Sequence, residues 1–294
     1  SAWPRAAASA VSCTWATTDF GADGPYVAAM KGVLLSLAPG CPLVDVSHAI
    51  PPQRIGEGAF VLASIVEAFP AGTIHVAVID PGVGTDRALV AIALDGQYFL
   101  APDNGLLDEM ARLLGKTPNA IHQLANPEFQ RAEVSSTFHG RDLLAPAAAY
   151  LATHPGRLSE LGPAQSQLRP RSDAESSFPR EQEPGRLVGR VLYRDRFGNL
   201  ITNLRARHWN DPTGSLPATW RLEIGGTILP ALSRTYGDHP PGSLIALLGS
   251  SGWLEIAAVN GSAADRLGAD VGTIVHLVTE LDPAADPQDE RSVG

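Results

Sequence analysis

Residues 76–87 are the part of the sequence that most limits how the chain can fold. An apolar run, 74–79, ends at Asp80, a turn rich in Pro and Gly follows, and a second apolar run begins after Arg87. The first run is too short for a helix, and its flanking Pro and Gly favour a buried strand. Asp80 is therefore expected at the carboxyl end of a core strand, where open α/β sheets bind ligands, with Arg87 beside it. A simpler interpretation also fits, in which Asp80 caps a turn and Arg87 begins an exposed strand.

Strand and helix patterns alternate along the first half of the chain. This alternation is typical of a parallel sheet with right-handed crossovers, and it predicts a doubly wound, mostly parallel α/β domain. A turn at Asp95-Gly96 predicts a hairpin. The expected strands are 11–17, 43–46, 73–80, 88–94 and 98–101, and the expected helices begin at Pro25, near Ile55, at Leu106 and near Leu143.

The composition changes within 163–185, which is rich in Pro, Ser, Gln, Arg and Glu. Short strand patterns without helices follow, and Gly225-Gly226 predicts a hairpin turn. Closely spaced strands of this kind indicate a small all-β barrel or sandwich. The predicted organisation is a tail (1–10), an α/β domain (11–162), a linker (163–185), a β-barrel-like domain (186–282) and a second tail (283–294).

Charge and cysteine content exclude several classes of partner. The 294-residue chain has a net charge of -9, whereas a nucleic-acid-binding protein normally presents a basic face. No apolar run is long enough to cross a bilayer, so no membrane partner is expected. The two cysteines, Cys13 and Cys41, lie in no CxxC or Cys/His cluster, which argues against structural zinc.

Six motifs lie at breaks between apolar segments. They are TDFG (18–21), DPGVGT followed by Arg87 (80–87), APDNGLL (101–107), TFHGRD (137–142), RFGNLITN (196–203) and GSSGWLEIA (249–257). Each alone is a weak signal, but six in register are specific. From about residue 11 to about 279 the set resembles the S-adenosylmethionine (SAM) hydroxide adenosyltransferases, or SAM hydrolases, which are relatives of fluorinating and chlorinating enzymes acting on SAM.

The resemblance implies two domains, a homotrimer with SAM bound between neighbouring subunits, and SAM as a substrate without any cofactor or metal. Because this substrate is intracellular, a cytoplasmic location is expected. The characteristic Asp, Arg and His of the family fall on Asp80, Arg87 and His139. The halogenating relatives have Tyr at the first of these positions and usually an aromatic residue at the last, so the resemblance favours water over halide. At Gly140 the fluorinating enzyme has Ser, although the chlorinating enzyme also has Gly.

The chemistry favours the same choice. A sulfonium makes the 5′ carbon of SAM electrophilic, and methionine leaves as a neutral thioether, so no general acid is needed. Water is a poor nucleophile unless a group accepts its proton or a charge stabilises hydroxide. Arg87 can supply that charge, while Asp80 and His139 orient the water and accept its proton. Which of the two takes the proton stays open, and an isolated His is more often structural.

The resemblance also implies a set of substrate-binding residues. Asp19 would bind the ribose hydroxyls, as a carboxylate can accept two hydrogen bonds, although a turn residue is the simpler interpretation. Gln53 stands where the fluorinating enzyme has Trp, so the substrate contact of that Trp is not inferred for Gln53. Asp142 is expected to be a structural carboxylate at a helix start. The remaining candidates are Phe197, Asn199 and Ser250, with Tyr236 as a stacking or rim aromatic and Glu255 as a weaker candidate on a strand face.

Three rival functions remain. A 5′-halogenase would use chloride, and a sensor would bind SAM or adenosine without turnover. A metal-dependent hydrolase could use Asp19, Asp80, Asp103 and His139, but no close-spaced ligand motif such as HExxH is present.

Overall fold

The computed structural model describes residues 13–171, 178–209, 220–229 and 232–279. The chain divides into two compact units, residues 1–174 and 175–294. Each unit is described by itself.

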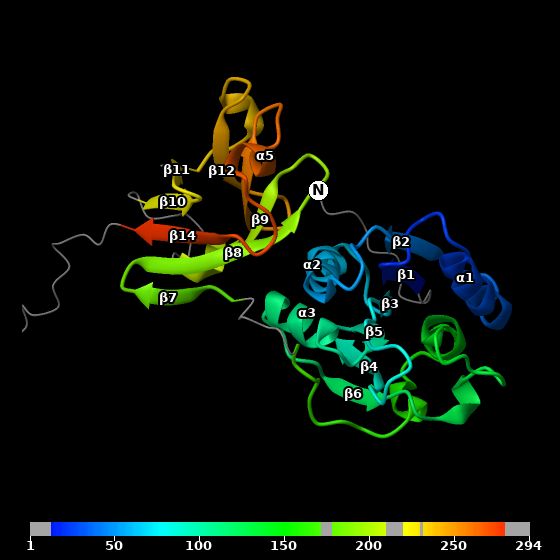
Figure 1. The fold of residues 1–294 in the computed structure, drawn as a ribbon. Helices are drawn as coiled ribbons and strands as arrows, with labels where there is room; N and C mark the ends of the chain where they lie inside the picture. The colour runs from blue at the N-terminus through cyan, green and yellow to red at the C-terminus, as the bar shows by residue number, and fades with distance from the viewer. Residues whose placement is uncertain (1–12, 172–177, 210–219, 230–231, 280–294) are drawn as a thin grey trace, which may run out of the picture. The chain divides into compact units, whose positions relative to one another are not determined.

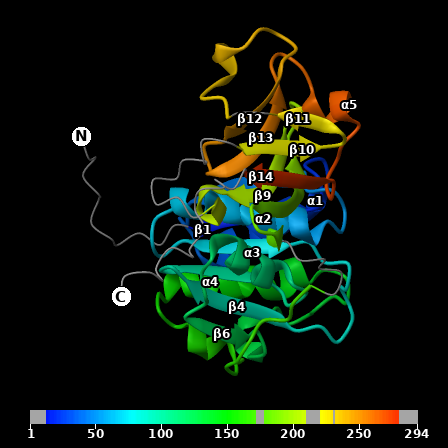
Figure 2. The ribbon, with the colours of Figure 1, turned by 90° about the vertical axis from the view of Figure 1, so that its left-hand side faces the viewer.

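The first unit is built on a six-stranded sheet in the order β2-β1-β3-β5-β4-β6 (Figure 1). The first four strands in this order run parallel, whereas β4 is antiparallel to both β5 and β6, which lie on either side of it. Figure 2 shows β4 and β6 side by side at the end of the sheet. The strands are β1 (Cys13–Thr18), β2 (Leu43–Ser47), β3 (Ile74–Val78), β4 (Leu89–Leu94), β5 (Gln97–Pro102) and β6 (Ala120–Gln123).

Helices cover both faces of this sheet, which confirms the doubly wound prediction. On one face, α1 (Pro25–Leu37) packs against α4 (Ala145–Thr153), and their apolar residues share a buried core with Val76 and Val78 of β3. On the other face, α2 (Ile55–Ile65) packs against α3 (Leu106–Leu114). Alternate residues of a strand point to opposite faces, and Ile79, just beyond β3, accordingly approaches Gly58 of α2.

Short elements complete the first unit. They are the 3-10 turns η1 (Val66–Ala68), η2 (Pro127–Phe129) and η4 (Leu158–Leu161), and the π-helical turn η3 (Gly140–Leu144) that precedes α4. The sequence pattern did not predict β6, because its four residues are all half-buried and carry no clear alternation.

The second unit is an antiparallel, nearly closed barrel-like sheet, which confirms the predicted all-β fold. Its order is β11-β10-β14-β8-β9-β13-β12, with β7 paired to β8, and β11 contacts β12 where the sheet almost closes. Gly225 and Gly226 have positive φ angles of 54° and 79°, as the predicted hairpin turn requires. The strands are β7 (Arg180–Glu183), β8 (Arg186–Arg194), β9 (Leu200–Arg205), β10 (Trp220–Ile224), β11 (Thr227–Leu229), β12 (Leu244–Leu248), β13 (Trp253–Ala258) and β14 (Ile274–Thr279).

Three short helical elements of this unit were not predicted, namely η5 (Ala206–Trp209), η6 (Tyr236–Asp238) and α5 (Ala263–Leu267). Strand β7 was also not predicted and lies within the segment 163–185. Its four residues are charged or polar and exposed, so they give no apolar signal.

No helix in the described ranges is long and apolar enough to span a lipid bilayer.

Candidate active site

The carboxyl ends of three neighbouring parallel strands place polar side chains at one edge of the first sheet. Thr18 at the end of β1 pairs with Val78 at the end of β3, so Asp19 and Asp80 follow at adjacent strand ends. On the other side of β1, Thr17 pairs with Ser47 of β2, which places His48 next in line. This edge is where the sequence predicted a ligand site.

Asp80 and Arg87 form a buried ion pair across the glycine-rich loop between β3 and β4. The Arg87 Nε donates to both carboxylate oxygens, at 2.6 Å and 2.8 Å, and its Nη2 also bonds Oδ2. The two side chains are only 5% and 6% exposed. A forked pair of charged hydrogen bonds fixes both groups in orientation. Arg87 therefore lies beside Asp80, as predicted, and does not begin an exposed strand.

His139 completes this cluster from the other end of the unit's sequence. Its Nδ1 accepts a hydrogen bond from Nη2 of Arg87 at 3.0 Å. A guanidinium can only donate, so Nδ1 is unprotonated and the ring proton is on Nε2. Burial and the charge of Arg87 lower the pKa of His139 below its ordinary value. At neutral pH the ring is therefore neutral and offers Nε2–H as a donor.

The close packing of Gly140 fixes the start of the π-helical turn that carries His139. A Cβ at this position would lie 2.9 Å from Sδ of Met30 on α1 and 3.5 Å from Val78 on β3. Only glycine fits without displacing Met30. The turn itself is of a rare type that occurs often at functional sites.

Asp142 has the structural role that was predicted, but through more contacts than a helix start requires. Its fully buried carboxylate receives hydrogen bonds from Arg141, Arg131 and the backbone N–H of Ser135. Burial alone would raise the pKa of Asp142, but these hydrogen bonds outweigh it and hold the pKa below its ordinary value. Asp142 thus anchors the loop that leads into His139.

Asp19 is oriented by a backbone group. Its Oδ2 accepts a hydrogen bond from the backbone N–H of Gln53 at 2.9 Å, and Gln53 has a positive φ of 65°. Within the described residues, Oδ1 has no such partner. Gln53 therefore contributes its main chain here, which the sequence comparison at this position did not indicate. The free oxygen is available to accept hydrogen bonds from a ligand.

An aromatic cluster that the sequence analysis did not single out lies beside Asp19 and His139. The rings of Phe20, Tyr26 and Phe138 have centroids 5.4–6.1 Å apart, and Tyr26 is 50% exposed. Phe20 directly follows Asp19, and Phe138 directly precedes His139. Both phenylalanines lie within the TDFG and TFHGRD motifs, so the signal was present in the sequence.

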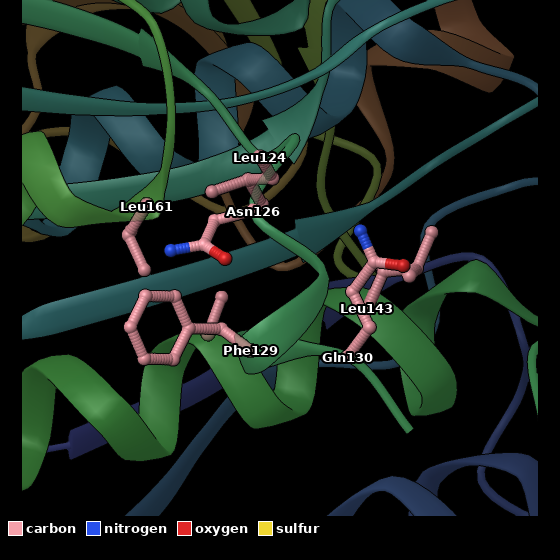
Figure 3. Close-up of a pocket in the computed structure, with 7 residues that line it drawn as sticks. Leu124, Asn126, Phe129, Gln130, Leu143 and Leu161 are labelled. Carbon is pink, nitrogen blue, oxygen red and sulfur yellow. The ribbon is translucent and has the colours of Figure 1, made fainter. Parts of the chain in front are cut away.

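A cavity of about 210 Å³ opens beside Arg87 and His139. Its other lining residues are Ala88, Leu89, Gln123, Leu124, Ala125 and Leu143. A second void shares Leu124 and Leu143 with it but has no room for a water molecule; Phe129 and Leu161 lie on one side of that void, and Gln130 and Leu143 on the other (Figure 3). Of these two voids, the cavity beside Arg87 is the one that has room for water.

The loop between β8 and β9 carries two predicted substrate residues, Phe197 and Asn199. Asp195, which was not predicted, holds this loop by accepting hydrogen bonds from the backbone N–H groups of both residues and from the Asn199 side chain, each at 2.9 Å. Gly198 packs directly onto Ser262, where a Cβ would lie 2.1 Å from the hydroxyl. This rigid turn leaves the Phe197 side chain 72% exposed.

Tyr236 and Glu255 lie together in the same unit. The Tyr236 hydroxyl donates a hydrogen bond to Glu255, and burial together with this bond raises the pKa of Tyr236. Burial also raises the pKa of Glu255, and the charge of Asp195 acts in the same direction. Ser250 is exposed in the turn next to Gly249, where a Cβ would lie 3.0 Å from the Glu255 carboxylate. The predicted residues of the second unit thus fall around Glu255 and Asp195.

Within the described residues, no three His, Cys, Asp or Glu side chains are arranged to hold a metal ion. The four proposed ligands of the metal-dependent alternative are therefore not grouped as such a site. Asp103, for example, instead binds Gln165 and the backbone of Arg169.

Both units match one protein family. Residues 15–162 match the SAM hydroxide adenosyltransferase N-terminal domain, and residues 189–276 match the C-terminal domain of the same family. This confirms the resemblance inferred from the six motifs.

Several curated proteins are similar over most of their length. The chain is 40% identical over 258 residues to the (R)-S-adenosyl-L-methionine hydrolase of Salinispora arenicola, covering 87% of this chain and 94% of the relative. It is also 40% identical over 270 residues to the enzyme of that name from Thermus thermophilus, covering 89% and 97%. A fluorinase from an Actinoplanes species is 29% identical over 273 residues, covering 82% and 88%.

Solved structures share the fold. An uncharacterized conserved protein from Thermotoga maritima superimposes with a TM-score of 0.81 at 28% identity, covering 90% of this chain and 99% of the other. A conserved hypothetical protein from Thermus thermophilus gives a TM-score of 0.70 at 37% identity, with coverage of 91% and 99%.

Proposed function

Because this chain belongs to the SAM hydroxide adenosyltransferase family, we propose that it hydrolyses SAM to adenosine and L-methionine. The observation that carries this proposal is that Arg87 bonds both Asp80 and His139 at the edge of the sheet. The carboxylate and guanidinium held in this way can orient a water molecule and accept its proton, while His139 holds the guanidinium.

The reaction is a substitution at the 5′ carbon of SAM. The water oxygen forms a bond to C5′ while the C5′–S bond breaks, and its electron pair neutralises the sulfonium. One proton is released from the water, and no acid is needed for the leaving thioether. Placing the water in line with the C–S bond supplies much of the rate gain.

Asp80 is the proton acceptor in this proposal. Nδ1 of His139 is already used by Arg87, so the ring can donate from Nε2 but cannot take a proton without breaking that contact. The Asp80 carboxylate has lone pairs beyond those that bind Arg87. A water that donates to Asp80 keeps a lone pair for C5′, and the guanidinium stabilises its developing negative charge.

The cavity beside Arg87 and His139 is the proposed source of this water. It is large enough for several water molecules, and the Arg87 guanidinium, His139 and Gln123 offer polar groups along its wall. Asp80 does not line it. In this proposal a water from the cavity moves past Arg87 to reach Asp80.

The remaining predicted residues bind the substrate in this proposal. The free oxygen of Asp19 would accept from the ribose hydroxyls. The exposed ring of Phe197 and the side chain of Asn199 would contact the adenosine or methionine part. Glu255, with Tyr236 and Ser250 beside it, would accept hydrogen bonds from an amino group of SAM. We propose no cofactor and no metal, because the substitution requires neither.

The proposed substrate epimer is (R)-SAM at the sulfonium centre. Relatives at 40% identity carry the name (R)-S-adenosyl-L-methionine hydrolase. Inverting the sulfur exchanges the directions of its methyl and 3-amino-3-carboxypropyl groups, so one pocket cannot hold both epimers equally. Separated epimers, followed by chromatography, should show hydrolysis of the (R) form at least tenfold faster, and equal rates would refute this assignment.

The activity is tested by incubating the purified protein with SAM in chloride-free buffer prepared in oxygen-18 water. Mass spectrometry should detect oxygen-18 in adenosine and release of methionine. Asp80→Ala should lose this activity, whereas Asp86→Ala, an exposed change in the same loop, should retain it. Intact SAM in the wild-type reaction would overturn the proposal.

The rival functions predict different results in the same assay. A halogenase would form 5′-chloro-5′-deoxyadenosine when chloride is added. A sensor would bind SAM saturably and release it unchanged. A metal-dependent hydrolase would lose activity in chelator, whereas the proposed reaction should be unaffected.

We also propose a homotrimer with active sites between neighbouring subunits. The proposed substrate residues are divided between the two units, which allows different chains to contribute them. Light scattering should give about 93 kDa, three copies of the 30.9-kDa chain. Mixing inactive Asp80→Ala and Asn199→Ala subunits should restore part of the activity. No recovery in demonstrably mixed trimers would refute shared sites.

The proposed location is the cytoplasm, since SAM is made and used there. Cys41 is disulfide-bonded, which is uncommon in that compartment. Cell fractionation with an antibody to the protein tests the location, and recovery with secreted proteins would refute it.

A further inference from the structure

A chain of hydrogen bonds behind Asp19 uses a histidine that the proposed reaction leaves without a role. Lys31 of α1 binds Oδ2 of Asp45 at 2.6 Å, and Oδ1 of Asp45 binds Nε2 of His48 at 3.0 Å. The other ring nitrogen, Nδ1, bonds the hydroxyl of Thr18 at 2.9 Å. Thr18 immediately precedes Asp19.

The order hydroxyl, imidazole, carboxylate matches that of a hydrolytic triad, but the burial of Thr18 excludes that role. This residue is 0% exposed, so no substrate can reach the hydroxyl. The carboxylate of Asp45 makes Nε2 a donor, and Nδ1 is left facing the Thr18 hydroxyl. The hydroxyl oxygen in turn faces the N–H of Phe20, at 3.4 Å. The network therefore ends in the backbone of the turn and not in a nucleophile.

His48 holds the Asp19 turn from both sides. Its side chain fixes Thr18, one residue before Asp19, and its backbone oxygen accepts from the N–H of Gly21, two residues after Asp19, at 2.9 Å. Five residues further along the same segment, the N–H of Gln53 holds the Asp19 carboxylate itself at 2.9 Å. Hydrogen bonds from the segment between His48 and Gln53 thus hold the Asp19 turn in position.

We propose that His48 is a positioning residue that presents the Asp19 carboxylate to the ribose hydroxyls of the substrate. This inference rests on the proposed function, which assigns the ribose to Asp19. His48 touches neither the substrate nor the reacting atoms. Its loss weakens ribose binding and leaves the chemistry at C5′, and hence kcat, nearly unchanged.

Two substitutions separate the two ring nitrogens. In His48→Asn the amide lies near the former Nδ1 and can still bond Thr18, whereas in His48→Gln it reaches the former Nε2 and can bond only Asp45. KM for SAM should rise about tenfold in His48→Gln and less than threefold in His48→Asn, with kcat within threefold of wild type in both. His154→Gln, an exposed change at the carboxyl end of α4, is the matched control.

A ligand comparison tests the link to Asp19 without turnover. Calorimetry should show that His48→Gln weakens adenosine binding about tenfold but leaves binding of 2′,3′-dideoxyadenosine within twofold, because that ligand has no ribose hydroxyls to lose. In the Asp19→Ala background, His48→Gln should likewise have no further effect on adenosine. Equal losses with both ligands, or a further loss in that background, would overturn the proposal.

Failure of the inference and failure of the proposed function are distinguishable. If the wild-type protein binds adenosine but leaves SAM intact, the hydrolase proposal fails while the calorimetric comparison still decides the role of His48. Circular dichroism establishes that each variant is folded. If His48→Gln does not fold, Asp45→Asn replaces it, and a smaller loss of adenosine affinity is expected. Unchanged adenosine binding by whichever of these variants is folded would refute the positioning role of His48.

Discussion

Replacing Asp80 by Asn leaves the Arg87 guanidinium in place, with a side chain only 5% exposed, but without its counter-charge. Breaking a buried ion pair in this way costs about 3–5 kcal/mol of the free energy of unfolding, because an uncompensated charge stays out of water. A typical domain has a total stability of about 5–15 kcal/mol. Asp80→Asn should therefore be markedly destabilised at neutral pH, and its kcat should fall by about 10²–10⁴-fold as the proposed proton acceptor is lost.

The double variant Asp80→Asn/Arg87→Met separates these two effects. Neutral side chains of similar size then replace the whole pair, and such replacements are often neutral or stabilising, because a buried pair contributes little net free energy. The double variant should recover most of the stability that Asp80→Asn loses. Its kcat should stay as low as that of Asp80→Asn, because both proposed catalytic groups are missing.

Urea unfolding followed by circular dichroism measures the stability. With a denaturant dependence of about 2 kcal/mol per M, the midpoint of Asp80→Asn should fall by about 1.5–2.5 M. Asp86→Asn, an exposed change in the same loop, should remain within about 0.5 kcal/mol of wild type. The reasoning is refuted if the double variant is as unstable as Asp80→Asn, or if it regains activity.

Three further perturbations test other parts of the site. Since burial and Arg87 lower the pKa of His139, activity should persist below pH 6.5 and be lost only as pH falls through that lowered pKa. NMR titration should show a higher pKa of His139 in Arg87→Met, and no rise would contradict the effect assigned to Arg87. Gly140→Ser should lower the free energy of unfolding, measured in urea, by about 1–3 kcal/mol, because the added side chain contacts Met30. Adding Met30→Ala to this variant should reduce the loss, and an unreduced loss would show that contact with Met30 is not its cause. Ala125→Leu, at the wall of the 210 Å³ cavity, should lower kcat at least threefold with KM unchanged, and an unaffected kcat would exclude the cavity as the water source.

The sequence predicts which strands and loops carry the site, but it predicts the side-chain hydrogen bonds within the site less well. Apolar runs and Gly or Pro breaks were enough to place Asp80 at a strand end and Arg87 beside it, because both signals are local. The bond between Arg87 and His139 spans 52 residues, and that between Thr18 and His48 spans 30. Which nitrogen faces which oxygen depends on strand order and register, which no local pattern contains.

The residues that the sequence analysis missed act through the main chain. The N–H of Gln53 is directed at Asp19 by a backbone conformation with positive φ, and side-chain identity gives no sign of this in a residue other than glycine. Asp195 lies next to a recognised motif and serves by accepting N–H groups of its own loop. The substrate residues were inferred from the resemblance to the family, which marks side chains at matching positions, so residues that organise the backbone around them were not expected.

The charge balance of the cluster gives a physical reason for the proposed use of water as the nucleophile. A halide ion needs a site with surplus positive charge or several free N–H donors. The charge of Arg87 is already compensated by Asp80, which accepts its Nε and Nη2, and neutral His139 adds none. A halide beside the Asp80 carboxylate would meet like charge, which costs free energy wherever water is excluded. Water is neutral and can donate to Asp80, so the sign of the local charge favours water over halide.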